Sequence, residues 1–263
     1  MNKIFAIKLK SDISGGGEIR IIADKEKISS SYLDYLHDES RLSYGEIECI
    51  AFPETEAQVA EFLQFANLRR MPVTISNGRT GIVGGAVPLK GALLSLEKLN
   101  KILEVKCIDS NYTVAMQAGV SLNELAKFLD GKNFPDGKYF YPVDVTEMTA
   151  RIGGTVATNA SGERSFRYGP TRNWVKRIRV VLATGEVLEI NRGEIFADER
   201  NEFEIEFPDG RITKIKIPSY KMPSVKSVAG YYTKPKMDLI DLFIGSEGTL
   251  GVITEIEIKI IKK

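Results

Sequence analysis

The sequence predicts an α+β fold with two lobes, a small parallel α/β lobe followed by a larger lobe with a mainly antiparallel sheet and helices. A strand–helix–strand pattern between residues 47 and 76 predicts the parallel part. Apolar and charged residues alternate over 202–217 around a cluster of turn residues, which predicts an antiparallel hairpin. The same alternation over 252–261 predicts one last strand.

One domain is expected over residues 46–263, with lobes of about 46–105 and 106–263. Residues 1–45 are expected to form an N-terminal extension that packs on this domain. In the extension, two short apolar stretches flank three glycines and predict a loose hairpin, and 29–44 predicts a helix and loop that carry His37. No stretch reads as a linker between independently folded parts.

The small lobe contains one well-marked helix between short strands. Thr55 and Gln58 form a capping box, after which Val59, Phe62, Leu63 and Ala66 recur at helical spacing. Pro72 is expected to end this helix. Buried strands are predicted at 47–52, 73–76 and 93–96.

The larger lobe begins with a strand over 113–118 and a second capped helix. Ser121 and Glu124 form the capping box of that helix, and Gly131 is expected to stop it. From Trp174 onward the pattern is that of strands. These strands are predicted at 178–182, 187–190, 203–207, 212–217 and 252–261.

Composition excludes several function classes. The 263 residues include 36 Lys+Arg and 35 Asp+Glu, so the formal charge is +1 and a broad nucleic-acid-binding surface is not expected. One histidine and two cysteines cannot build a clustered metal or iron–sulfur site. No stretch approaches the roughly 20 apolar residues of a membrane span, and no signal peptide is visible. These features, with two thiols that need not pair, predict a cytoplasmic protein without direct membrane insertion.

Three glycine-rich segments are the candidate functional parts. Residues 76–86 can form a loop whose N–H groups hold a diphosphate, or simply a tight connection between strands. The small residues of 152–162 can lie against a flat ring system, or can reflect close backbone packing. Residues 244–254, with glycines around Glu247, can be only a turn. Taken singly, each segment leaves both interpretations open.

Together and in this order, the segments resemble the flavin-binding domain of the vanillyl-alcohol oxidase superfamily, also called the PCMH-type FAD domain. Within that group the sequence is most similar to the glycolate oxidase FAD subunit and D-lactate dehydrogenase branch. The resemblance covers residues 45–261. The stretches that carry it are 52–55, 80–88, 117–120, 153–162, 168–172 and 243–254.

The resemblance implies non-catalytic, cofactor-holding roles for particular residues. Residues 77–81 would wrap the FAD pyrophosphate, 142–146 would lie beside the flavin and ribityl chain, and the Ile253 backbone would meet the adenine end. The cofactor-binding residues that it implies are Ser76, Asn77, Gly78, Arg79, Thr80, Gly81, Gly84, Pro142, Asp144, Thr146, Thr149, Gly153, Gly154, Ala157, Thr158, Asn159, Gly162 and Ile253.

The sequence departs from the family pattern in the first segment, where Asn77 and Arg79 stand at positions that commonly hold glycine. Either the loop is remodelled or Arg79 adds a phosphate contact. Some relatives attach the flavin to histidine or cysteine, but His37 lies far outside the matching segments, so non-covalent FAD is expected. Arg172 is expected to be a solvated arginine with a supporting role.

The resemblance implies a flavoprotein: a FAD-binding subunit or module of an oxidoreductase that oxidises a 2-hydroxy acid, with hydride transfer to flavin N5. Relatives continue into a cap domain that orients the substrate, and this chain stops at Lys263. We therefore expect no catalytic residue or metal site in the chain, and a partner subunit that supplies the cap or the electron acceptor. The alternatives are a non-catalytic electron-transfer or scaffold module and a small flavin reductase.

Overall fold

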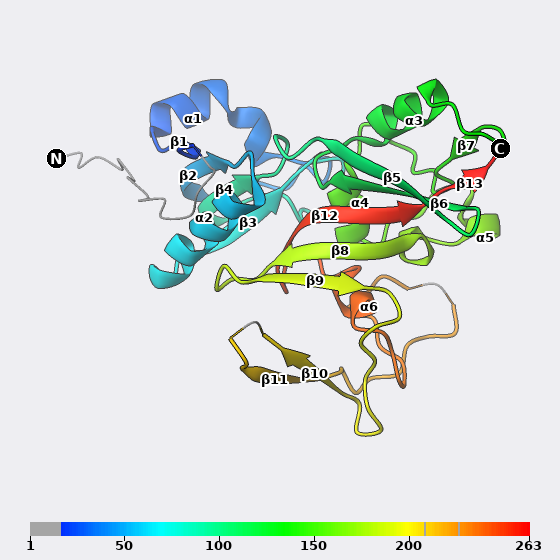
Figure 1. Cartoon of the computed structure of the whole chain (residues 1–263). Helices are drawn as coiled ribbons and strands as arrows, with labels where there is room; N and C mark the ends of the chain where they lie inside the picture. Colours follow the sequence, from blue (N-terminus) through cyan, green and yellow to red (C-terminus); the bar gives the residue numbers. More distant parts are fainter. Residues whose placement is uncertain (1–16, 208, 226) are drawn as a thin grey trace.

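Two sheets side by side form the core of the molecule (Figure 1). The structure, a computed structural model, describes residues 17–207, 209–225 and 227–263. The predicted leading hairpin falls partly on residues outside this set. The rest is a mixed α and β fold with several sheets, as the sequence predicts.

The small sheet has four strands. They are, in spatial order, β1 (Arg20–Ile22), β2 (Glu46–Phe52), β4 (Lys90–Ser95) and β3 (Val73–Ser76). β4 pairs in parallel with both β2 and β3, and β1 adds an antiparallel edge. The predicted strand–helix–strand unit is therefore present, with β4 inserted between its two strands. β1 also makes residues of the N-terminal extension part of this sheet.

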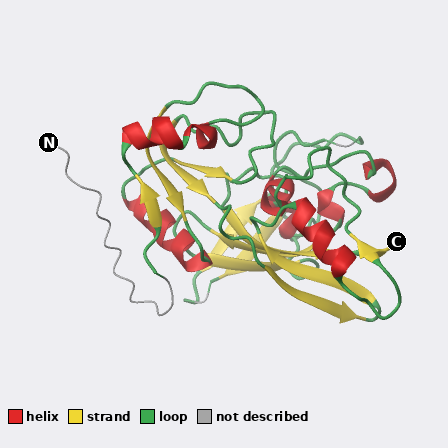
Figure 2. Cartoon of the chain, turned by 90° about the horizontal axis from the view of Figure 1, so that it is seen from above, coloured by secondary structure: helices red, strands yellow, loops and turns green. Residues whose placement is uncertain are grey.

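Helices cover both faces of the small sheet (Figure 2). On one face, α2 (Glu56–Leu68) buries Phe62 in the same apolar cluster as Leu94. On the other face, α1 (Lys25–Ser31) and the 3-10 helix η1 (Leu33–Leu36) pack over Leu93. These two apolar layers bury the sheet on both sides, as expected for parallel strands.

The helix ends follow from local hydrogen bonds. Thr55 Oγ1 accepts the Gln58 N–H at 3.2 Å, as predicted, while the Gln58 side chain accepts the N–H of Glu54. The first helix starts earlier than the predicted residue 29, because Asp24 accepts the Lys27 N–H at 2.9 Å and begins α1.

The larger sheet has five antiparallel strands. They are, in spatial order, β5 (Ile102–Ile108), β6 (Asn111–Gln117), β12 (Val252–Lys259), β8 (Val175–Val181) and β9 (Val187–Asn191). β5 was not predicted. Its ladder with β6 places residue 105 inside the larger sheet, so the change from one sheet to the other falls between 95 and 102.

Short elements complete the larger lobe. The helices are α3 (Leu122–Gly131), α4 (Ile152–Ala157), α5 (Ser165–Tyr168), the 3-10 helix η2 (Thr171–Asn173) and α6 (Ile240–Phe243). Both bonds of the capping box predicted for α3 are present. The predicted hairpin forms from β10 (Glu202–Glu206) and β11 (Ile212–Lys216).

The predicted last strand is divided in two. β12 ends at Lys259, the Ile260 N–H then donates to Tyr112 O, and β13 (Ile261–Lys262) pairs with β7 (Tyr139–Phe140) beside α3 (Figure 1). Among the described residues, no helix combines the length and the hydropathy that a membrane crossing requires.

Candidate functional site

The first and second glycine-rich segments meet at the carbonyl oxygen of Ala118, just after β6. Asn77 follows the last residue of β3, and its Nδ2 donates to Ala118 O at 2.9 Å. The N–H of Gly153, near the start of α4, donates to the same oxygen at 2.9 Å. The loop after β3, the end of β6 and α4 are therefore tied together at one atom.

The two glycines of α4 face different surroundings. A Cβ placed on Gly153 would lie 2.6 Å from Ala118 Cβ and 3.0 Å from Asn77 Nδ2, so this position is closed by protein. A Cβ placed on Gly154 would have no atom within 4 Å. Gly153 thus serves close packing, whereas the backbone at Gly154 borders open space that a ligand can reach.

Buried polar atoms without partners gather at the ends of β3 and β4. Ser76 Oγ, Asn77 Oδ1 and Ser95 Oγ are buried and have no hydrogen-bond partner. Ser76 and Ser95 are register partners in the two strands, and both are fully buried. Such atoms in a folded protein are expected to bind ordered water or a ligand. Ser95 was missed by sequence reasoning, since a lone serine at the end of a strand carries no signal.

The third glycine-rich segment lies between α4 and β3. The N–H of Gly245 donates to Val156 O at 3.0 Å, and the N–H of Glu247 donates to Ala157 O at 2.9 Å. A Cβ on Gly248 would lie 3.2 Å from Ile75 Cγ1 in β3. All three segments are therefore brought to one junction between the lobes.

The predicted turn at 142–146 is held against the end of the second segment. A Cβ on Gly162 would lie 1.4 Å from Asp144 O, so only glycine fits this contact. Asp144 Oδ2 also pairs with Arg164 Nε at 3.1 Å. Pro142 is buried here, whereas the side chains of Thr146 and Thr149 are exposed.

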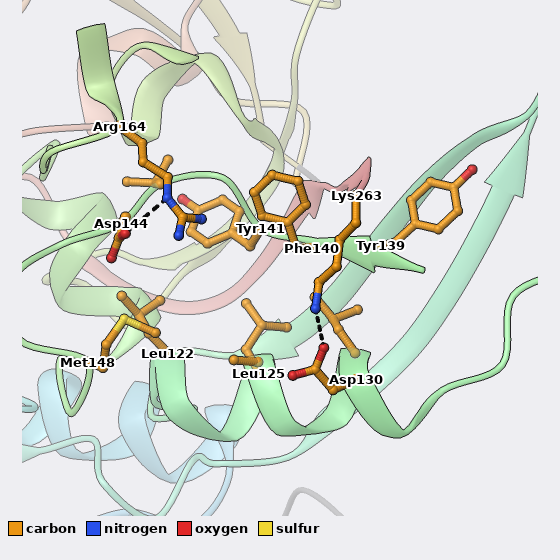
Figure 3. Close-up of a pocket in the computed structure, with 13 residues that line it drawn as sticks. Leu122, Leu125, Asp130, Tyr139, Phe140, Tyr141, Asp144, Met148, Arg164 and Lys263 are labelled. Atoms are coloured by element: carbon orange, nitrogen blue, oxygen red, sulfur yellow. Dashed lines mark hydrogen bonds and ion pairs between the residues drawn. The ribbon is translucent and has the colours of Figure 1, made fainter. Parts of the chain in front are cut away.

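A cavity of about 240 Å³ lies beside this turn, between α3 and β7 (Figure 3). Its apolar lining includes Leu125 and Met148, and the Arg164–Asp144 and Lys263–Asp130 ion pairs lie in its wall. Asp144 is the one predicted cofactor residue among the lining residues. The cavity therefore adjoins the junction of the three segments and does not coincide with it.

The remaining predicted residues lie around the same junction. Thr158 Oγ1 donates to Gly154 O at 2.9 Å, and Asn159 Oδ1 accepts the Arg172 N–H at 3.0 Å. In the first loop, Thr80 is half-buried and Gly81 is exposed. Further residues of the set are Gly78, whose Cβ would lie 3.2 Å from the Arg151 N atom, and the half-buried Ala157.

Ile253 is buried in β12 beside a hydrogen-bonded link between the lobes. The next residue, Thr254, donates through Oγ1 to Glu56 at 2.6 Å, and Glu56 at the start of α2 pairs with Arg179 of β8 at 2.7 Å. Burial alone would raise the pKa of Glu56, but the hydrogen bonds from Arg179 and Thr254 lower it below its usual value. Sequence reasoning missed this link, because its three residues are far apart in the chain.

The expectation that Arg172 is solvated is wrong. Its side chain is buried, donates to Asp241 Oδ1 at 3.0 Å and to Ile244 O, and lies 4.1 Å from the centre of the Tyr232 ring. Burial lowers the pKa of its guanidinium, and Asp241 partly offsets that effect. Arg172 therefore anchors α6 and the first residue of the third glycine-rich segment.

The cysteines and the histidine lie outside the three segments. Cys49 is buried in β2, where burial raises the pKa of its thiol to about 11, and Cys107 is exposed on β5. Neither forms a disulfide. His37 packs edge-on against Tyr44, with 4.9 Å between the ring centres. In the part of the chain that the structure describes, no three His, Cys, Asp or Glu residues form a group that could hold a metal ion.

Residues 47–191 match the family described as FAD binding domain. The D-lactate dehydrogenase of Anaerostipes hadrus is 36% identical over 231 residues, which are 87% of this chain and 39% of that protein. The D-2-hydroxyglutarate dehydrogenase of Xanthomonas citri pv. viticola is 35% identical over 213 residues, 80% of this chain and 36% of that protein. The chain thus spans less than half of the length of these relatives.

Solved structures share the fold at lower identity. Physcomitrella patens BBE-like 1 superposes with a TM-score of 0.64 and 15% identity, over 94% of this chain and 43% of that chain. An alkyldihydroxyacetonephosphate synthase superposes with a TM-score of 0.57 and 22% identity, over 82% of this chain and 32% of that chain. At this level of identity the likeness concerns the fold alone.

Proposed function

Because the chain belongs to the family of PCMH-type FAD binding domains, we propose that it holds FAD for an oxidoreductase that oxidises a 2-hydroxy acid. The observation that carries this proposal is the meeting of three glycine-rich segments around Ala118 and α4. Backbone N–H groups and unpartnered polar atoms at such a junction suit a diphosphate and a flat heterocycle.

In this proposal, different residues at the junction bind different parts of FAD. The loop after β3 would bind the pyrophosphate through its N–H groups, with Ser76 Oγ and Asn77 Oδ1 free to take ordered water or ligand contacts. The open backbone at Gly154 would lie against the ring system. FAD supplies the hydride acceptor, N5, and the protein's part is to bind and orient it and to exclude water.

We propose that the cofactor is bound non-covalently. Some relatives link the flavin through histidine or cysteine, and here these residues lie outside the three glycine-rich segments: His37 follows η1, Cys49 is in β2 and Cys107 is in β5. The raised pKa of Cys49 keeps its thiol protonated and unreactive. Two cysteines without a disulfide also support a reducing, cytoplasmic location.

The substrate class follows from the relatives' names. D-lactate and D-2-hydroxyglutarate are both 2-hydroxy acids, and the dehydrogenases named for them are more than twice as long as this chain. We propose that the groups that orient the substrate and take its hydroxyl proton lie outside residues 1–263, in a partner subunit or in a further part of the same protein. The turn at 142–146 would present the flavin to that partner.

Binding and release of the chromophore test the cofactor proposal. Purified protein should quench FAD fluorescence on titration and release unmodified FAD on heating, whereas an unchanged flavin signal would overturn it. For the function, reduction of the bound flavin by a D-2-hydroxy acid should require the copurified partner. Bleaching by NADPH with the chain alone would favour a flavin reductase in its place.

A further inference from the structure

The N-terminal extension lies along the loop that follows β3. Tyr35 of η1 contacts Arg79, Leu42 lies against Gly84, and the N–H of Gly45 donates to Pro88 O at 2.9 Å. These contacts reach the beginning, the middle and the end of the loop. The family match begins at residue 47, so this extension is not part of the matched domain.

Arg79 has an unusual backbone for a long side chain. Its φ is +57°, in the left-handed region that glycine adopts freely and that other residues adopt at a cost. Arg79 therefore needs its surroundings to hold it in this conformation. The loop carries the N–H groups proposed to bind the pyrophosphate, so a change of conformation at residue 79 would redirect them.

Tyr35 makes the contact that can hold Arg79. The Arg79 guanidinium carbon lies 4.4 Å from the centre of the Tyr35 ring, within the range of a cation–π interaction. The same guanidinium donates to Asn77 O at 3.3 Å, inside its own loop. The side chain thus bridges the ring of η1 and the first residue after β3.

The Tyr35 ring is itself fixed to the sheet. Its hydroxyl donates to Glu97 Oε1 at 2.8 Å, and its ring packs edge-on against Phe52, with 5.2 Å between the centres. Burial and the bond to Glu97 raise the pKa of the Tyr35 hydroxyl to about 12, so the ring stays neutral and keeps this bond. Tyr35 is therefore held rigidly, because Glu97, which accepts its hydroxyl, lies only two residues past the end of β4.

We propose that Tyr35 is a positioning residue, which holds Arg79 in its left-handed conformation and so keeps the loop after β3 ready to bind the pyrophosphate of FAD. The inference rests on the proposed function, because it concerns the same site. It gives the extension a role in cofactor affinity, although no residue of the extension need touch FAD.

A double-mutant cycle on the full chain tests this. In Tyr35→Leu, which keeps an apolar side chain on Phe52, the Kd for FAD should rise about five- to tenfold. In Arg79→Gly the left-handed conformation needs no support, so adding Tyr35→Leu to it should leave the Kd unchanged within twofold. Tyr35→Phe keeps the ring and should bind FAD within about twofold of the unsubstituted chain.

The control is Tyr32→Leu, because Tyr32 packs on Phe52 and Tyr35 in the same cluster but makes no ring contact with Arg79. It should lower the melting temperature of the apo-protein about as much as Tyr35→Leu while leaving FAD affinity unchanged. The proposed role of Tyr35 would be overturned if Tyr35→Leu weakened FAD binding equally with Arg79 and with Arg79→Gly. It would also be overturned if Tyr32→Leu weakened FAD binding as much as Tyr35→Leu. Absence of FAD binding by the unsubstituted chain would instead overturn the proposed function, and this inference with it.

Discussion

Gly154→Ala separates the stability of the fold from the affinity for the cofactor. Gly154 lies inside α4, and an added Cβ has no protein atom within 4 Å. If the chain needed nothing at this position, alanine would be the better residue for the helix. A glycine at this position is explained if a ligand lies against the backbone, because the ligand would occupy the space of a Cβ.

The two effects have opposite signs and measurable sizes. Replacing a helical glycine with alanine stabilises a protein by up to about 1 kcal/mol, and no clash offsets this in the apo-protein. A methyl group inserted into a well-packed contact costs about 1–3 kcal/mol, which corresponds to roughly a 5- to 150-fold rise in Kd. The variant should therefore melt later without FAD and bind FAD more weakly.

Thermal unfolding of the apo-protein and fluorescence titration with FAD measure the two quantities. Gly131→Ala is the matched control, because Gly131, the last residue of α3, also has no atom within 4 Å of an added Cβ and lies outside the predicted cofactor residues. It should leave the Kd for FAD unchanged. Unaltered FAD affinity in Gly154→Ala would refute the placement of the ring system against α4.

Two further predictions concern the contacts that hold the site. Gly162→Ala would place a Cβ 1.4 Å from Asp144 O, so the turn must move, and we expect at least about 3 kcal/mol less stability in urea unfolding; a loss below 1 kcal/mol would contradict this contact. Glu56→Gln should lower the free energy of unfolding by about 2 kcal/mol. Glu257→Gln should lower it by less than about 1 kcal/mol, because Glu257 makes a single 3.4 Å contact with Arg177 within the larger sheet. Because the folded-state pKa of Glu56 is lowered, its contribution is complete above its ordinary pKa of 4.5 and is lost as the pH falls through the folded value. Urea unfolding should therefore show a smaller difference in stability between Glu56→Gln and the unsubstituted chain below pH 4 than at pH 7. An equal difference at the two pH values would contradict this role of Glu56.

Strong local signals were enough to predict much of the fold. The capping residues Thr55 and Ser121 begin α2 and α3 as predicted, and the alternating pattern of β10 and β11 forms the predicted hairpin. These elements depend on interactions between residues close in sequence. α4 was missed because its glycines disfavour a helix, and it is instead held by distant bonds such as that from the Gly153 N–H to Ala118 O.

The candidate site, like the fold, was predictable only where the signal is local in sequence. Glycine spacing in the three segments pointed to a site, but the carbonyl at which two of them meet has no side-chain signal. Arg172 looked like a surface arginine because its partners, Asp241 and Ile244, lie about 70 positions further along the chain. The support of Arg79 by Tyr35 was hidden for the same reason, since the extension that supplies it is weakly patterned.

At the junction of the three glycine-rich segments, we propose that FAD is held without a covalent bond. The most direct measurement is titration of the apo-protein with FAD, followed by heat denaturation and chromatography of the released chromophore. We expect saturable binding of one FAD per chain and full recovery of unmodified FAD in the supernatant. No saturable binding, or flavin that stays with the denatured protein, would contradict it.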